Sequence, residues 1–154
     1  MPAPADLDSL LTLDDFEALA QRRFDPGVFA FVAAGAADEF TLRWNREAFN
    51  RVALRPKALD GFLNLNLRVD LVGRTFEHPV LLAPASRQRL VHPEGEAEAA
   101  RGAAMAHTLF AVGGFTTTSI EEIRTAAPTV PLWFQIYPQL DQGVMLDTVR
   151  RAEA

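Results

Sequence analysis

The feature that most constrains this chain is a short apolar run, residues 80–83, that passes through Pro84-Ala85-Ser86 into a helix opening at His92-Pro93-Glu94. An apolar strand of this length that leads through a turn into a helix is typical of a parallel strand and its crossover helix. Two further units of the same kind follow, with strands predicted at 109–112 and 132–137. In such units ligands bind at the carboxyl ends of the strands, so we expect a site in the loops after them.

Helices are predicted after each of these strands, over 94–106, 120–126 and 142–151, and the second opens on the capping box Ser119-Ile-Glu-Glu122. Alternating strands and helices predict an α/β fold with a parallel sheet. An open Rossmann sheet would show a G-x-G-x-x-G turn after its first strand, and the turn here has no glycine. The other arrangement of repeated strand–helix units, a closed barrel, is therefore favoured. Because a (β/α)8 TIM barrel takes about 250 residues and this chain has 154, we expect a partial barrel of about three βα units.

The residues before Pro79 predict an N-terminal helical preamble and a β-hairpin. Residues 1–12 contain two prolines and are expected to form a flexible arm, and residues 13–154 are expected to form one domain, the N-terminal portion of the barrel. The elements predicted in the preamble are helices from Leu13 to the break at 25–27, over 27–34 and over 38–49, an extended segment over 51–59, and a hairpin over 67–77 that turns at Gly73-Arg74.

Composition and charge exclude several classes of function. Hydrophobic residues make up 49% of the chain, as in globular proteins, and the net charge of −5 gives no electrostatic reason to bind nucleic acid. The chain has no cysteine, and its three histidines lack the spacing of a helical metal site, so we predict no metal. It shows no signal peptide and no apolar run of the roughly 20 residues that a membrane span needs. We therefore expect a cytoplasmic protein.

Several segments together resemble the amino-terminal region of the FMN-dependent α-hydroxy acid oxidases and dehydrogenases, a family that includes glycolate oxidase, lactate oxidase, lactate monooxygenase and mandelate dehydrogenase. They occur in the family's order and cover almost all of the chain after residue 12. The segments are Phe29–Thr41, Arg55–Leu59, Leu71–Gly73, Leu82–Ala85, His92–Glu96, Thr117–Ile123, Trp133–Tyr137 and Arg150–Glu153.

The resemblance implies FMN as the cofactor and the oxidation of a small 2-hydroxy acid to a 2-oxo acid. It implies that the backbone of residues 84–86 runs along the reactive edge of the flavin, that Gly113 lies near the ring, and that Gln135 hydrogen-bonds the ring's polar edge. Tyr137 would point its hydroxyl at the substrate and count as both a catalytic and a cofactor contact. The cofactor-binding residues implied in this way are Pro84, Ala85, Ser86, Gly113, Gln135 and Tyr137.

Each of these positions also has a purely structural interpretation. Residues 84–86 are common turn formers, and Gly113 relieves backbone crowding at a strand end. Gln135 is also consistent with a satisfied core amide, and Tyr137 with an aromatic side chain whose hydroxyl is in water. The resemblance favours the flavin-binding interpretation at all four places.

The chain departs from the family at Phe31, at Gly113 and in the stretch 86–89. Phe31 stands where the family generally has a tyrosine that helps to hold the substrate carboxylate, so the ring is kept and a hydrogen bond worth about 1.5–3 kcal/mol is lost. Gly113 lacks the small hydroxyl side chain usual at its position, and 86–89 (Ser-Arg-Gln-Arg) replaces a stretch that is usually apolar.

The family's later strands supply a lysine near the flavin, a histidine base, an arginine for the substrate carboxylate and the FMN phosphate site. None of the three histidines here is predicted to replace that base. We therefore expect the isolated chain to be inactive. Three interpretations stay open: the amino-terminal part of an oxidoreductase, a non-enzymatic truncated fragment, and a half-site completed by a partner chain or by a homo-oligomer.

Overall fold

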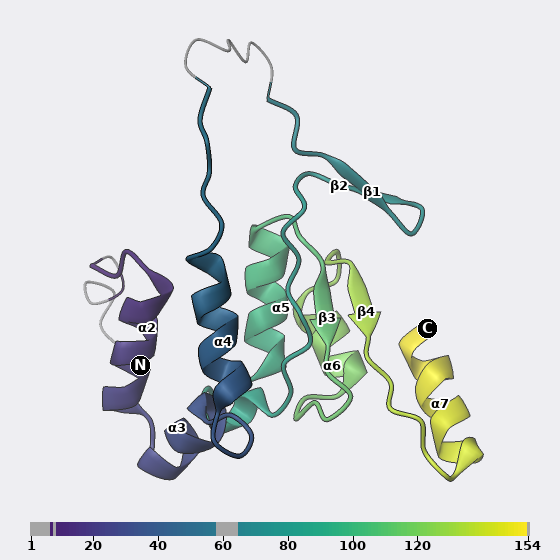
Figure 1. The fold of residues 1–154 in the computed structure, drawn as a ribbon. Helices are drawn as coiled ribbons and strands as arrows, with labels where there is room; N and C mark the ends of the chain where they lie inside the picture. Colours follow the sequence, from purple (N-terminus) through teal and green to yellow (C-terminus); the bar gives the residue numbers. More distant parts are fainter. Residues whose placement is uncertain (1–6, 8, 58–64, 154) are drawn as a thin grey trace. The chain divides into compact units, whose positions relative to one another are not determined.

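The computed structural model describes residues 7, 9–57 and 65–153, which divide between two compact units, residues 1–61 and 62–154 (Figure 1). In the described residues the strands form two small sheets and no closed barrel. The domain limits predicted from the sequence, at residues 12 and 13, stay a prediction. The predicted extended segment is without strand structure over 51–57, and its last two residues lie outside the described ones.

In the first unit, two helices begin at side chains that cap them. Thr12 begins α2 (Leu13–Arg23) with a capping box to Asp15. The Asp25 carboxylate accepts hydrogen bonds from two backbone N–H groups at the start of α3 (Pro26–Ala33), where proline suits the first turn. These helices and α4 (Phe40–Phe49) confirm the predicted helical preamble. None of the residues of the three helices is buried in the described structure.

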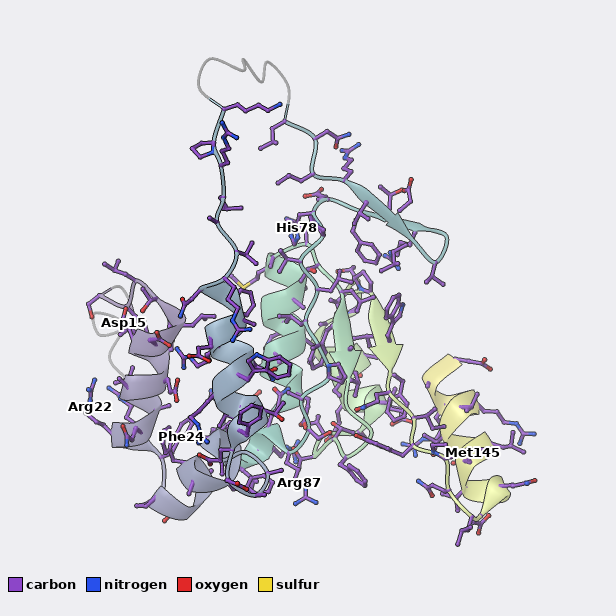
Figure 2. The ribbon with its side chains drawn as sticks, in the orientation of Figure 1. Asp15, Arg22, Phe24, His78, Arg87 and Met145 are labelled. Carbon is purple, nitrogen blue, oxygen red and sulfur yellow. The ribbon has the colours of Figure 1, made fainter. Side chains whose placement is uncertain are left out.

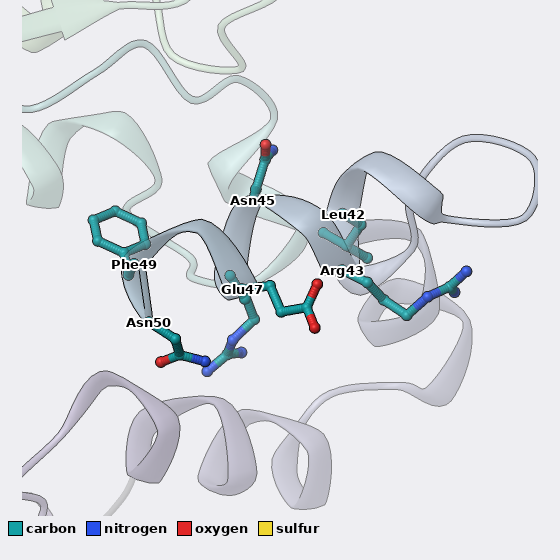
Figure 3. A pocket seen from close by; sticks show the side chains of 7 residues that line it. Leu42, Arg43, Asn45, Glu47, Phe49 and Asn50 are labelled. Carbon is teal, nitrogen blue, oxygen red and sulfur yellow. The ribbon is translucent and has the colours of Figure 1, made fainter. Parts of the chain in front are cut away.

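A hollow in this unit lies along α4 (Figure 3). All of its lining residues come from α4 or directly follow it, and none is a predicted site residue, so the hollow is not the predicted site. One of them, Arg46, forms ion pairs with Asp14 and Glu17 of α2. The lining residues are Leu42, Arg43, Asn45, Arg46, Glu47, Phe49 and Asn50.

The second unit contains the predicted parallel strands. Strand β3 (Phe110–Val112) pairs in parallel with β4 (Leu132–Phe134), and Leu82 forms a parallel bridge to Phe110. Two hydrogen bonds of 3.0 Å make the bridge, from the Leu82 N–H to the Leu109 carbonyl and from the Ala111 N–H to the Leu82 carbonyl. The strand predicted over 80–83 is therefore reduced to one bridged residue. After it, Pro84 has no N–H to donate; before it, the Val80 N–H donates to His78 Nδ1 and the Val80 carbonyl accepts from the Thr108 hydroxyl.

The core lies between these strands and two helices, α5 (Glu96–Met105) and α6 (Ile120–Ala126). Ala100 and Ala103 of α5 are fully buried, and their small side chains let the helix pack closely against Phe110 and Val112 of β3. The capping box predicted at Ser119 is present at the start of α6. Helix α7 (Gln142–Glu153) is joined to α6 by the ion pair between Arg151 and Glu121 at 2.7 Å.

The predicted hairpin consists of β1 (Val69–Leu71) and β2 (Arg74–Phe76). Its turn is formed by Val72 and Gly73, one residue earlier than predicted, and both have positive φ angles, 49° and 71°. Two positive φ angles define the type I′ turn that suits the twist of a two-residue hairpin. Phe76, which is 4% exposed, packs against Leu109 just before β3, so the hairpin lies toward the amino-terminal end of the parallel strands.

Val72 is a β-branched residue whose backbone lies in the left-handed region, a conformation that is strained for most residues other than glycine and asparagine. It is also exposed, so replacing it removes no buried contact. We expect Val72→Asn to raise the free energy of unfolding by about 1 kcal/mol, measured by urea denaturation. Gly73→Ala should have the opposite effect and lower the free energy of unfolding. Its new Cβ would meet open space, so the backbone strain of an alanine at positive φ is the one change. A less stable Val72→Asn variant would contradict the I′ turn.

Candidate functional site

The loops after the first two parallel segments meet through the Ser86 side chain. The Phe115 N–H donates to Ser86 Oγ at 3.2 Å, although the two residues are 29 positions apart in the chain. Gly113 ends β3 against the same serine: a Cβ on Gly113 would lie 2.2 Å from Ser86 Oγ. The predicted site residues Ser86 and Gly113 are therefore in direct contact.

The loops after β3 and β4 meet through Gln135 and Tyr137. Gln135 Oε1 accepts a hydrogen bond from the Gly114 N–H at 3.4 Å, and Gln135 Nε2 donates to the Tyr137 hydroxyl at 3.1 Å. The Phe115 ring stacks on the Tyr137 ring with centroids 5.0 Å apart and an angle of 28°. Gly114 allows this approach, because a Cβ there would lie 2.8 Å from the Gln135 carbonyl oxygen.

The carboxylate of Glu96, at the start of α5, is fully buried and connects the two loops that carry Ser86 and Phe115. In one loop it accepts a hydrogen bond from the Gln88 N–H at 3.2 Å. In the other it accepts from the Thr117 N–H at 2.9 Å, the Thr117 hydroxyl at 2.7 Å and the Thr118 hydroxyl at 2.9 Å. A buried carboxylate is tolerated when its acceptor positions are filled in this way.

Hydrogen bonding keeps Glu96 ionised. Burial by itself raises the pKa of this carboxyl, but the hydrogen bonds from Thr117 and Gln88 more than offset that effect and lower the pKa from 4.5 to about 2. Gln88 is fixed at both ends, because its side-chain amide also donates to the Ala85 carbonyl at 2.9 Å. The turn of residues 84–86 is thus tied to Glu96 through Gln88.

The structure brings together five of the predicted cofactor contacts directly or through these bonds, namely Ala85, Ser86, Gly113, Gln135 and Tyr137. Pro84 precedes Ala85 in the same exposed turn. Phe31 lies on α3, in the first unit, and is 61% exposed. The roles of these residues in binding a cofactor or substrate stay predictions.

His78 lies away from the site. Its Nδ1 accepts from the Val80 N–H at 3.3 Å, so its Nε2 donates to the Ala106 carbonyl at 3.0 Å. Figure 2 shows His78 and Arg87 toward opposite ends of α5, with Arg87 in the loop that follows the first parallel segment. His78 thus fixes the entry to that segment.

Sequence reasoning missed Glu96, Gly114 and Phe115 as parts of the site. Glu96 occurs in the segment that supported the resemblance, but an acid in the first turn of a helix is ordinary. Phe115 follows two glycines at a strand end, and its stacking on Tyr137 becomes visible only in three dimensions.

Comparison with known proteins identifies the family. The family model for FMN-dependent dehydrogenases matches residues 20–154. Glycolate oxidase 3 of Oryza sativa subsp. indica is 34% identical over 147 residues, which are 96% of this chain and 40% of the relative. A crystal structure of a Pediococcus acidilactici protein assigned as a lactate oxidase matches with a TM-score of 0.89 at 34% identity, over 94% of this chain and 40% of that one. A mandelate oxidase structure matches with a TM-score of 0.86 at 35% identity, over 94% of this chain and 42% of that one.

The chain belongs to the FMN-dependent dehydrogenase family. FMN is the cofactor of this family, and the mixed helix and strand structure matches part of the fold of its oxidases. The chain spans about 40% of the length of the relatives that it matches. None of the helices in the described ranges is long and apolar enough to cross a membrane.

The side chains at the strand ends fit the ring of such a cofactor. A flavin ring presents carbonyl oxygens, ring nitrogens and an N–H group along one edge, and the Gln135 amide can both donate and accept. After its bonds to Gly114 and Tyr137, this amide keeps one N–H and one oxygen lone pair for a ligand. The Ser86 and Tyr137 hydroxyls add two further groups of the same dual character.

We expect Glu96→Gln to lower the free energy of unfolding by about 3 kcal/mol near pH 7, because a pKa lowered from 4.5 to about 2 corresponds to that amount. The folded-state pKa is depressed, so this contribution is present above about pH 4.5 and is lost as the pH falls toward 2. Urea denaturation of both proteins between pH 7 and pH 3 should show the difference between them shrinking.

Glu98→Gln is the matched control, because Glu98 is exposed on the same helix and its ion pair with Arg101 is on the surface. It should change the stability by less than about 1 kcal/mol. A Glu96→Gln deficit that stays constant across this pH range would show that the ionised carboxylate is not what holds the loops.

Proposed function

We propose that this chain is the flavin-binding amino-terminal part of an FMN-dependent oxidoreductase that converts a small 2-hydroxy acid into a 2-oxo acid. One observation carries the proposal: Ser86, Gly113, Gln135 and Tyr137 converge at the carboxyl ends of adjacent parallel segments. This is the edge where α/β proteins bind their ligands. The family membership and the relatives, named as oxidases of glycolate and mandelate, support it.

In this proposal each side chain has a defined task. The Gln135 amide bonds the polar edge of the ring, and the exposed backbone of residues 84–86 lies along its reactive edge. Bound FMN supplies the electron acceptor for the oxidation. Tyr137 presents its hydroxyl to the substrate, and the bond from Gln135 Nε2 orients it by using the oxygen as acceptor, so the O–H hydrogen is left for the substrate.

The stacked rings of Phe115 and Tyr137 form an aromatic surface at the same edge. Such a surface excludes water from one side of a ligand and favours a planar or apolar group. Phe31 brings no hydroxyl to the substrate, so the substrate carboxylate would depend on Tyr137 and on groups outside this chain's strand ends.

The fold proposed for this function is a partial (β/α)8 barrel with a helical preamble and a hairpin. In the described residues β4 pairs with β3 alone, which leaves its other edge without a strand neighbour. An unpaired edge of a parallel sheet is a surface for a further strand. This observation favours a second candidate, a half-site that becomes active when a partner chain or a second copy covers the β4 edge.

FMN binding by the purified chain tests the proposal directly. We expect quenching of FMN fluorescence on titration with the chain, with weak affinity because the groups proposed at the strand ends bind the ring and not the phosphate. Gln135→Ala should weaken binding about five-fold, as expected for one lost hydrogen bond. Gln21→Ala, an exposed glutamine of α2 in the other unit, should leave it unchanged. Absence of any binding by the unmodified chain would refute the flavin-binding function.

Turnover of 2-hydroxy acids separates a complete enzyme from part of one. We expect the isolated chain, supplied with FMN, to oxidise glycolate, lactate or mandelate no faster than free FMN does, because in the described residues the hydrogen bond to the Tyr137 hydroxyl comes from the Gln135 amide and not from a base. Oxygen uptake and sizing chromatography on the same sample measure activity and association together. Rapid turnover by a monomer would contradict the proposal that the chain is only part of the enzyme.

A further inference from the structure

Ser86 and Gly113 exclude one another's side chains. A Cβ on Gly113 would lie 2.2 Å from Ser86 Oγ and 3.2 Å from the Ser86 backbone nitrogen. Atoms that are not bonded cannot approach to 2.2 Å, so a side chain at 113 requires the hydroxyl at 86 to leave. The Ser86 hydroxyl therefore fills the volume that a side chain of residue 113 would fill.

The Ser86 hydroxyl is held in one place but keeps its hydrogen for another group. Its oxygen accepts the hydrogen bond from the Phe115 N–H at 3.2 Å, which anchors it over the end of β3. A hydroxyl has one hydrogen to donate besides its lone pairs. In the ranges that the structure describes, the bond from Phe115 is the one this side chain makes. Ser86 is half-buried, so part of the residue faces solvent.

The same contact connects Ser86 to the other strand ends. Phe115 carries the donor to Ser86 and also the ring that stacks on Tyr137, and its neighbour Gly114 donates to Gln135. Ser86 thus belongs to the same connected set of groups as the proposed ring contacts. Two consecutive residues of one loop, Gly114 and Phe115, connect Ser86 to Gln135 and Tyr137.

We propose that the Ser86 hydroxyl donates a hydrogen bond to the flavin ring, from the space that a side chain at position 113 would otherwise occupy. The inference rests on the proposed function, because it assumes that the ring binds at these strand ends. It makes Ser86 a cofactor contact through its side chain and not only through its backbone. It also predicts that a serine can serve at either position but not at both.

Three variants test this exchange by thermal unfolding and by FMN titration. Ser86→Ala should keep the fold and weaken FMN binding about five-fold, since one hydrogen bond is lost. Gly113→Ser should lower the melting temperature, because its Cβ would lie 2.2 Å from Ser86 Oγ and 3.2 Å from the Ser86 backbone nitrogen. The double variant, Ser86→Ala with Gly113→Ser, should regain most of the FMN affinity and part of the lost melting temperature. The clash with Ser86 Oγ is removed, while the new Cβ still lies 3.2 Å from the backbone nitrogen of residue 86.

Gly102→Ser is the matched control for the glycine substitution, because a Cβ on Gly102 meets nothing within 4 Å. Unchanged FMN affinity in Ser86→Ala would overturn the inference and leave the proposed function standing. A double variant that regains its melting temperature without regaining FMN affinity would also overturn it, since the hydroxyl would then be filling space alone. No FMN binding by the unmodified chain would instead overturn the proposed function, and this inference with it.

Discussion

The arrangement of the candidate site depends on the buried carboxylate of Glu96. A charge without solvent must have its acceptor positions filled, and here donors come from Gln88, Thr117 and Thr118. Those residues belong to two loops that leave different parallel segments. Since the loops are in turn joined by the bond from Phe115 to Ser86, any movement of one loop against the other would break a bond to the carboxylate or to that serine. The buried charge thus converts two exposed loops into one rigid edge.

Much of the second unit could be predicted from sequence because its signals are local. The capping box at Ser119 specifies the start of α6 through side-chain bonds to neighbouring backbone, and the apolar run before Gly113 gives a fully buried strand. Signals that depend on neighbours in space were less informative. The strand over 80–83 shrank to the Leu82 bridge because strand length depends on pairing partners, and the hairpin turn moved to Val72, a residue that propensity alone would not place at positive φ.

The site itself was predictable only as a set of positions. The resemblance located Ser86, Gly113 and Gln135, but it could not show that Ser86 and Gly113 share one volume, because that depends on the distance between two backbones. Glu96 escaped notice for a related reason. An acidic residue in the first turn of a helix normally faces water and the helix dipole, and nothing local distinguishes it from a buried one. Burial is a property of the packed loops around it.

The chemistry of the strand ends also limits what they can recognise. Their converging groups, Ser86, Gln135 and Tyr137, are all neutral, whereas a 2-hydroxy acid and a flavin phosphate are anions. Hydrogen bonds from neutral groups suit a ring edge, but anions are bound most strongly by charge-assisted bonds. Arg89 does not fill this gap, because its side chain packs over Gly95 and lies near Glu122, whose pKa is lowered by the hydrogen bonds from Ser119 and further by this arginine. The strand ends are therefore suited to recognising the ring, and the recognition of charge falls to groups outside this set.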